Sequence, residues 1–107
     1  MEVKQYEIVL VNLDPTIGSE MKKTRPCAVI SPDEMNKYLQ TIVVAPLTSS
    51  SKPYPTRVEI NHAQTKGRIV LDEIRTVDRI RIVKKLDQLT TSEIESVKAV
   101  IMETYVE

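Results

Sequence analysis

The chain has 107 residues, the size of one domain with a single modest core. Its 15 Lys and Arg residues balance 15 Asp and Glu residues, so a general nucleic-acid coating protein is not indicated. The only cysteine, Cys27, excludes an internal disulfide and a cysteine-based zinc cluster and fits a reducing cytoplasm. No apolar run is long enough to span a membrane or to form a secretory signal. We therefore expect one cytoplasmic domain, residues 1–107, with no membrane contact.

The first two strands are predicted on either side of a long polar loop. Residues 6–13 are β-rich and apolar on both faces at their centre, which is typical of a buried strand. Residues 27–30 return as the second strand. At the exit of the loop Arg25 precedes Pro26, which restricts Arg25 to extended backbone. A guanidinium placed in this way beside a basic loop suits a bound phosphate, although a solvated hairpin tip has the same composition.

The middle of the chain predicts a helical turn, a third strand and a second polar loop. Ser31 is the predicted N-cap of a short helical turn that ends near Asn36, with Pro32 at its first helical position. Residues 41–48 form the third strand, and Pro46 places that end at a sheet edge or bulge because it has no N–H. Residues 49–55 form a polar loop of a length typical of binding loops.

Three more short strands follow, over residues 56–60, 67–71 and 79–83, because apolar residues are concentrated or alternate there. Residues 72–77 continue or kink the second of these strands. The connection at 61–66 contains the only histidine, His62, which we expect to be a solvated loop residue.

The chain ends in a predicted helix over residues 92–106. Thr90, Thr91 and Ser92 are possible N-caps, and Ser92 with Glu95 has the spacing of a capping box. The helix carries one apolar stripe, made by Ile94, Val97, Val100, Ile101 and Tyr105. Six or seven short strands with a terminal helix predict a mainly β protein, a small barrel closed so that no strand edge is exposed.

The supply of reactive side chains limits the chemistry. A histidine-based catalytic triad or zinc site would have to rest on the single histidine, and two glycines are too few for a glycine-rich phosphate-binding loop. The absence of Trp and Phe argues against an aromatic surface on which RNA bases stack. Basic residues cluster before the acid-rich C-terminal segment, which is compatible with a local basic face. The remaining candidates are mostly at strand ends or in loops: Glu20, Arg25, Thr48, Ser49, Asp72, Glu73 and Arg75.

One reaction needs only such groups. RNA carries its own nucleophile, the 2′-hydroxyl beside each phosphate, so a protein need only move protons and stabilise charge on the phosphorus. Arginine donates planar, charge-assisted hydrogen bonds to phosphate oxygens. A threonine hydroxyl supplies one more donor, so Arg25 and Thr48 fit this chemistry without a metal or cofactor. Taken alone, Thr48 is equally well explained as a residue that ends a strand.

Three blocks of sequence resemble the MazF/PemK (Kid) toxins of bacterial toxin–antitoxin systems. They are Leu13-Asp14-Pro15-Thr16-x-Gly18-Ser19-Glu20 with Lys23-Thr24-Arg25-Pro26 and Val29-Ile30-Ser31, then Val44-x-Pro46-Leu47-Thr48-Ser49, then Asp72-Glu73-Ile74-Arg75-Thr76-Val77-Asp78. Their order and spacing extend the resemblance from about Tyr6 to Tyr105.

The resemblance implies an SH3-like barrel of the PemK/CcdB type with a C-terminal helix, working as a bacterial cytoplasmic homodimer. It implies a sequence-specific, metal-independent endoribonuclease that cuts single-stranded mRNA without a cofactor and leaves 2′,3′-cyclic phosphate and 5′-hydroxyl ends. A cognate antitoxin is expected to cover the RNA groove, and DNA binding is expected through the antitoxin complex.

The resemblance also assigns roles to individual residues. Arg25 handles protons and charge at the phosphate, Thr48 donates a hydrogen bond to it, and Glu20 orients Arg25 or tunes its proton affinity. RNA-binding roles fall to residues of the two loops and of the third block: Ser19, Lys22, Lys23, Thr24, Ser49, Ser50, Lys52, Glu73 and Arg75.

The chain departs from the family pattern at three positions. Glu73 stands where many relatives have a glutamine that is implicated in RNA binding. Ser19 replaces a histidine, and Val70 replaces an arginine, found in some members. Loss of that arginine disfavours a variant mechanism in which it works with the acid at Asp72.

Three alternative functions follow. They are a degenerate member that only binds RNA or antitoxin, a CcdB-like gyrase poison, and an SH3-like module for proline-rich ligands. The gyrase poisons need a C-terminal Trp-Gly-Ile, whereas this chain ends Tyr105-Val106-Glu107. The last function needs an aromatic groove, and the four tyrosines are scattered along the sequence.

Overall fold

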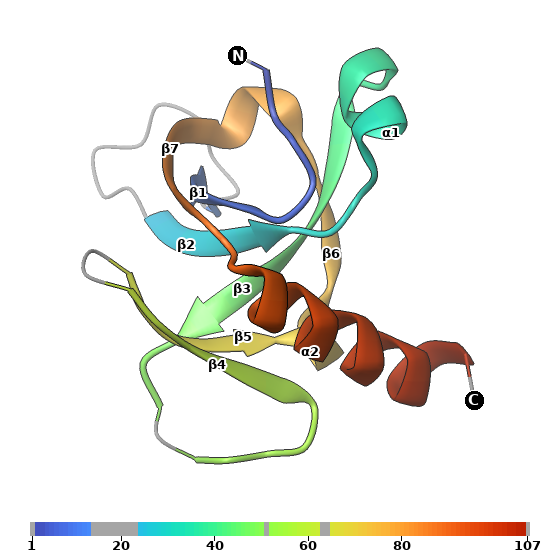
Figure 1. The fold of residues 1–107 in the computed structure, drawn as a ribbon. Helices are drawn as coiled ribbons and strands as arrows, with labels where there is room; N and C mark the ends of the chain where they lie inside the picture. The colour runs from blue at the N-terminus through green and yellow to red at the C-terminus, as the bar shows by residue number, and fades with distance from the viewer. Residues whose placement is uncertain (1, 14–23, 51, 63–64, 107) are drawn as a thin grey trace.

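An antiparallel sheet curled around one central strand makes up most of this computed structural model, which describes residues 2–13, 24–50, 52–62 and 65–106 (Figure 1). Within these residues the sheet has seven strands, in the order β4-β5-β3-β2-β1-β7, and β6 also pairs with β3. The strands are β1 (Glu7–Asn12), β2 (Thr24–Val29), β3 (Thr41–Thr48), β4 (Arg57–Asn61), β5 (Lys66–Val70), β6 (Arg75–Asp78) and β7 (Ile82–Gln88). The mainly β class expected from the sequence is confirmed.

Strand β3 lies at the centre of this sheet and has the bounds that the sequence predicts. It pairs with β2 along one edge and with β6 and then β5 along the other. Of the two alternatives predicted for Pro46, a sheet edge or a bulge, the sheet edge is wrong, because Pro46 is buried and opposite Cys27 of β2. On the other side of β3 the pairs with β6 end at Val44 and those with β5 begin at Leu47. The residue without an N–H therefore lies where the ladder on that edge is interrupted.

That interruption decides between the two alternatives expected for residues 72–77, a continued strand or a kink, in favour of the kink. A 3₁₀ turn, η1 (Leu71–Glu73), separates β5 from β6. The strand predicted over 79–83 is displaced, because residues 79–81 form a second 3₁₀ turn, η2 (Arg79–Arg81), before β7. The cause is local: the Asp78 side chain accepts a hydrogen bond from the Ile80 N–H at 2.9 Å and caps this turn.

Two apolar clusters lie on opposite faces of the sheet, as the period-two alternation of a strand requires. In β1, Ile8 joins the cluster that packs against the C-terminal helix, whereas Val9 and Val11 join the other. Cys27 is fully buried in the second cluster, and this burial raises the pKa of its thiol to about 12. The thiol therefore stays protonated and unreactive at neutral pH.

The short helix α1 (Asp33–Tyr38) follows β2, but its cap differs from the prediction. Pro32 is the N-cap, and Ser31 makes no cap hydrogen bond. Ser31 is buried instead: its hydroxyl donates to Asn36 Oδ1 and accepts from the Val43 N–H at 3.0 Å. The Asn36 amide donates in return to the Ser31 carbonyl at 2.9 Å. Ser31 thus joins α1 to β3.

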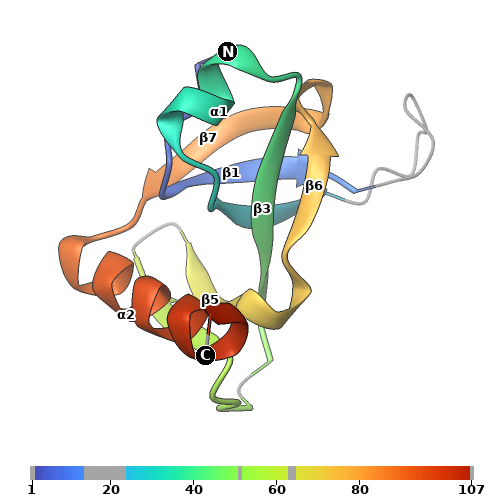
Figure 2. The ribbon, with the colours of Figure 1, turned by 90° about the vertical axis from the view of Figure 1, so that its right-hand side faces the viewer.

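The C-terminal helix α2 (Thr91–Ile101) crosses the β4–β5 side of the sheet (Figures 1 and 2). Thr90 and Glu93 form its capping box, not Ser92 and Glu95. The predicted apolar stripe is confirmed at Val97, which is fully buried. Beyond α2, residues 102–106 continue as a π-helical turn, η3 (Met102–Val106). Neither helix in the described ranges is both long enough and apolar enough to cross a bilayer.

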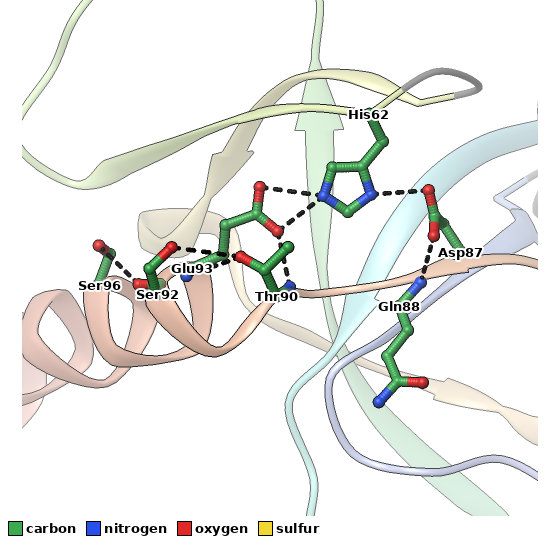
Figure 3. Close-up of polar contacts among 7 residues, drawn as sticks. All are labelled: His62, Asp87, Gln88, Thr90, Ser92, Glu93 and Ser96. Atoms are coloured by element: carbon green, nitrogen blue, oxygen red, sulfur yellow. Dashed lines mark hydrogen bonds and ion pairs between the residues drawn. The ribbon is translucent and has the colours of Figure 1, made fainter.

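The hydrogen-bonded order of the strands leaves β4 and β7 unpaired with each other at the two ends of the sheet. The described strands therefore form a half-barrel, and the prediction of a closed barrel is wrong in this respect. His62, directly after β4, connects this end of the sheet to β7 at the other end and to α2. Its Nδ1 lies 2.6 Å from Asp87 Oδ2 on β7, and its Nε2 lies 2.7 Å from Glu93 Oε1 on α2 (Figure 3). We call these three residues the His62 clamp. The prediction of a solvated loop histidine is wrong, since only 13% of the His62 side chain is exposed.

The clamp is expected to make stability depend on pH. The hydrogen bond to Asp87, followed by that to Glu93, raises the pKa of His62. Because the pKa of His62 is higher in the folded than in the unfolded protein, the clamp stabilises the fold fully below the pKa of the unfolded state, about 6.5. This stabilisation is lost as the pH rises through the pKa of the folded state. Only the protonated ring donates from both nitrogens. We expect the free energy of unfolding to fall by roughly 1–3 kcal/mol across that window, the value of one charged hydrogen bond.

Urea unfolding at several pH values from 6 upward measures this effect. His62→Gln is expected to remove the pH dependence in that window, and Asp87→Asn is expected to reduce it. A pH dependence in His62→Gln equal to that of the wild type would assign the titration to another group.

Candidate active site

Arg25 and Thr48, predicted to act together, come from neighbouring strands. The antiparallel register of β2 and β3 pairs Cys27 with Pro46. Arg25 lies two residues before Cys27 on β2, and Thr48 lies two residues after Pro46 on β3. Because side chains two residues apart on a strand point to the same face, and so do paired residues, the guanidinium and the hydroxyl share one face.

The two residues line one hollow of about 310 Å³, which we call the Arg25–Thr48 hollow. Its described lining contains two cations and no acidic side chain. The lining residues are Thr24, Arg25, Pro26, Leu47, Thr48, Ser49 and Lys66. Four residues predicted for the site, Ser19, Glu20, Lys22 and Lys23, lie outside the described part of the chain.

The Thr48 hydroxyl is held in place by its own loop. Thr48 Oγ1 accepts a hydrogen bond from the Ser50 N–H at 3.2 Å. This bond occupies an acceptor position and leaves the O–H able to donate. Thr48 is half-buried at the end of β3, so the hydroxyl is both fixed and accessible. It is suited to donate to an oxygen of a bound anion.

Arg25 is exposed on β2, two residues before Cys27, which is buried in the second apolar cluster. The charges of Arg25 and Arg75 both act on the Cys27 thiol beneath, although they lower its pKa less than burial raises it. Two guanidiniums therefore lie near one buried sulfur. These two positive charges favour the approach of a phosphate.

Strand β5 contributes residues that the sequence analysis did not assign to the site. Lys66 lines the Arg25–Thr48 hollow and also a neighbouring hollow of about 270 Å³, the β5 hollow. The β5 hollow is lined by Ser49, Ser50, Glu59, Ile60, Asn61, Lys66, Gly67 and Arg68. The sequence did contain a signal for these residues, because Lys66 and Arg68 flank Gly67 at the start of the strand predicted over 67–71.

Gly67 lets β5 approach the backbone of Thr48 closely. It has φ +146°, and a Cβ built on it would lie 2.6 Å from the Thr48 carbonyl oxygen. Real Cβ atoms are not found so close to a carbonyl, so a side chain here would displace β3 or β5. The missing side chain at Gly67 thus helps to fix the position of Thr48.

The remaining predicted RNA-binding residues lie outside both hollows. Lys52 is exposed in the loop after β3, and its N–H approaches Ser50 Oγ at 3.4 Å. Glu73 ends η1 and is exposed, and Arg75 begins β6. Asp72 accepts a hydrogen bond from the Thr56 hydroxyl at 2.8 Å, which suggests a structural role.

The site combines a guanidinium, an oriented hydroxyl and an ammonium group around an open hollow. Such a set binds a phosphate and stabilises extra negative charge on it. The described residues contain no group of three or more His, Cys, Asp or Glu side chains placed to hold a metal ion.

Comparison with known proteins identifies the family. The model of the PemK-like, MazF-like toxins of type II toxin–antitoxin systems matches residues 4–105. The chain belongs to this family. A relative named Endoribonuclease MazF, from Staphylococcus saprophyticus, is 33% identical over 105 residues, which cover 92% of this chain and 88% of the relative. The MazF/PemK assignment made from the three sequence blocks is confirmed.

Solved structures of MazF proteins share the fold. MazF of Deinococcus radiodurans (Form-I) superposes with a TM-score of 0.83 at 24% identity, over 100% of this chain and 99% of that one. A MazE–MazF structure from the same organism (Form-II) gives 0.83 at 25% identity, over 96% and 95%. A mycobacterial endoribonuclease in complex with its cognate antitoxin gives 0.82 at 16% identity, over 94% and 92%. The expected PemK-type fold is therefore confirmed, as a mostly β half-barrel with a C-terminal helix.

Proposed function

We propose that this chain is the endoribonuclease toxin of a type II toxin–antitoxin system, and that it cuts single-stranded RNA at a specific sequence without a metal. Family membership and the name of the staphylococcal relative support the activity. The observation that carries the proposal is the meeting of Arg25 and Thr48 in one hollow without an acidic lining residue in the described ranges.

The proposed reaction uses the substrate's own nucleophile. The 2′-oxygen attacks the adjacent phosphorus, the new P–O2′ bond forms, and the bond from phosphorus to the 5′-oxygen breaks. One proton leaves the 2′-hydroxyl and one is delivered to the departing 5′-oxygen. The products are a 2′,3′-cyclic phosphate and a 5′-hydroxyl, so no water, metal or cofactor is consumed.

Each site residue has a role in this scheme. Arg25 donates to the non-bridging oxygens, where negative charge grows in the transition state, and assists proton movement. The Thr48 hydroxyl donates one further hydrogen bond. Glu20, outside the described residues, orients Arg25 or tunes its proton affinity.

We also propose the partners and the compartment. The MazE–MazF and mycobacterial complexes support a cognate antitoxin for this chain. An antitoxin that covers the Arg25–Thr48 hollow would block RNA entry, and DNA binding would arise in that complex. A homodimer and a bacterial cytoplasmic location complete the proposal, and a buried free thiol is consistent with that compartment.

The test is cleavage of a long unstructured RNA by the purified, antitoxin-free protein in excess EDTA, with mapping of each cut and its end groups. Cuts at one short sequence that end in cyclic phosphate are expected. A copy with 2′-deoxynucleotides at the mapped positions should resist cleavage. If folded protein makes no cuts, the chain is a member that only binds RNA or antitoxin.

Glu73→Gln is expected to improve RNA binding, because an exposed carboxylate beside Arg75 repels the phosphates that Arg25 and Arg75 attract. Removal of one exposed charge changes binding by roughly 0.2–1 kcal/mol, so KM is expected to fall about 1.4- to 5-fold. The preferred base at one position is also expected to change, since an amide can donate as well as accept.

Steady-state kinetics and cut mapping measure both effects. Glu103→Gln, which removes the same charge from the exposed C-terminal turn, is the matched control. Unchanged KM and unchanged cut sequence in Glu73→Gln would show that Glu73 takes no part in RNA binding.

A further inference from the structure

The start of β5 places two cations beside the proposed active site. Lys66 is shared by the Arg25–Thr48 hollow and the β5 hollow, as is Ser49, so the two hollows are neighbours. Arg68 lines only the β5 hollow. An extended ligand that continues from the Arg25–Thr48 hollow into the β5 hollow therefore contacts Lys66 before Arg68.

The register of the sheet fixes which way these cations lie. Arg68 pairs with Thr48 across β5 and β3, so the two residues share a face of the sheet. Lys66 is two residues from Arg68 on the same strand and lies on that face as well. Gly67 between them brings the strand against the Thr48 carbonyl. Lys66, Arg68, Thr48 and Arg25 thus belong to one continuous surface.

The charges on this surface are only weakly compensated. No described residue forms an ion pair with Lys66, which is exposed. Arg68 lies 3.8 Å from Glu59, whose side chain is 68% exposed, so this pair is weak. Glu59 is the one acidic side chain in the described lining of the two hollows, against the three cations Arg25, Lys66 and Arg68. An excess of positive charge is electrostatically suited to a polyanion, and single-stranded RNA offers one phosphate for each nucleotide.

We propose that Lys66, supported by Arg68, binds the RNA phosphate next to the one held by Arg25 and Thr48. This inference rests on the proposed function, because it takes the Arg25–Thr48 hollow as the position of the cut. It implies that the substrate must extend over β5 by at least one nucleotide on that side. Lys66 then fixes the strand through its backbone, whatever its sequence.

The first experiment measures binding and does not require cleavage. The dissociation constant of a single-stranded RNA that carries 2′-deoxynucleotides is measured by fluorescence anisotropy at several salt concentrations. Lys66→Ala is expected to bind roughly 10-fold more weakly than the wild type, with a salt dependence smaller by about 0.7 in slope, the value of one phosphate contact. Lys98→Ala, an exposed lysine on α2 that lines neither hollow, is expected to bind like the wild type.

The second experiment locates the phosphate. Each linkage around the cut is replaced in turn by a neutral methylphosphonate, and kcat/KM is measured. At one linkage beside the cut, the neutral replacement is expected to lower kcat/KM of the wild type about 10-fold, mainly by raising KM. The same replacement should change kcat/KM of Lys66→Ala only slightly. Lys98→Ala should keep the wild-type pattern.

The outcomes separate this inference from the proposed function. Equal affinity of Lys66→Ala and wild type for the RNA overturns the role of Lys66, whether or not the RNA is cut. Equal losses for both proteins at every modified linkage also overturn it. Weakened binding by Lys66→Ala together with no cleavage by the wild type would support the phosphate contact and contradict the ribonuclease.

Discussion

Replacement of Arg25 by alanine is expected to lower kcat for RNA cleavage by on the order of 100- to 1000-fold, the usual effect of removing one preorganised donor to a transition state. The guanidinium is exposed at the start of β2 and lines the hollow in which Thr48 also lies. Because its side chain is outside both apolar clusters, its loss should not unfold the protein. Circular dichroism and the unfolding midpoint should therefore match the wild type.

Two variants sharpen this test. Arg25→Lys keeps the charge but loses the planar fork of donors, and is expected to remain well below wild-type activity. Lys98→Ala removes one positive charge from α2, outside both hollows, and is expected to be fully active. Normal cleavage by folded Arg25→Ala would end the mechanism proposed above.

Gly67→Ala is expected to have the second largest effect, although the methyl group would touch no substrate. A Cβ at this position meets the Thr48 carbonyl oxygen at 2.6 Å, and φ +146° is unfavourable for alanine. The backbone must shift, at a cost of roughly 1–3 kcal/mol in stability. A displacement of about 1 Å at a reacting group typically costs about 100-fold in rate, so kcat is expected to fall by a similar factor.

The control separates lost stability from a displaced hydroxyl. Val97→Ala removes two buried methyl groups from the core cluster under α2 and should destabilise the fold by roughly 1–3 kcal/mol, and Val97 does not line the Arg25–Thr48 hollow. At a temperature where both variants are folded, Val97→Ala should cleave RNA normally and Gly67→Ala should not. Equal activities would show that Gly67 has no influence on the active site.

The features predicted well from sequence depend on short stretches of chain. Strand β3 was predicted with its bounds because a run rich in β-branched residues, Thr41 to Val44, stands after a helical turn and continues to a polar loop. For residues 72–77 the sequence left a continued strand and a kink both open, and the 3₁₀ turn η1 forms the kink. The pairing of Arg25 with Thr48 came from the family resemblance, and the register of β2 and β3 now places the two residues on one face.

The features that were missed depend on contacts between distant segments. Two Ser/Thr-x-x-Glu patterns overlap at the start of α2, and only one can form the capping box. Glu93 takes part because it closes the box with Thr90 and also contacts His62, which lies 31 residues earlier in the sequence. Lys66 could not be assigned to the site because its place follows from the pairing of β5 with the end of β3.

The central position of β3 has a consequence for how activity is lost on heating. Its edges are shared among three other strands, so its amide protons should exchange with deuterium only when the whole molecule unfolds. Thr48 ends this slowest-exchanging strand. Local opening elsewhere, such as fraying of α2, should leave its hydroxyl in place. Inactivation should therefore follow the global melting curve in a single step.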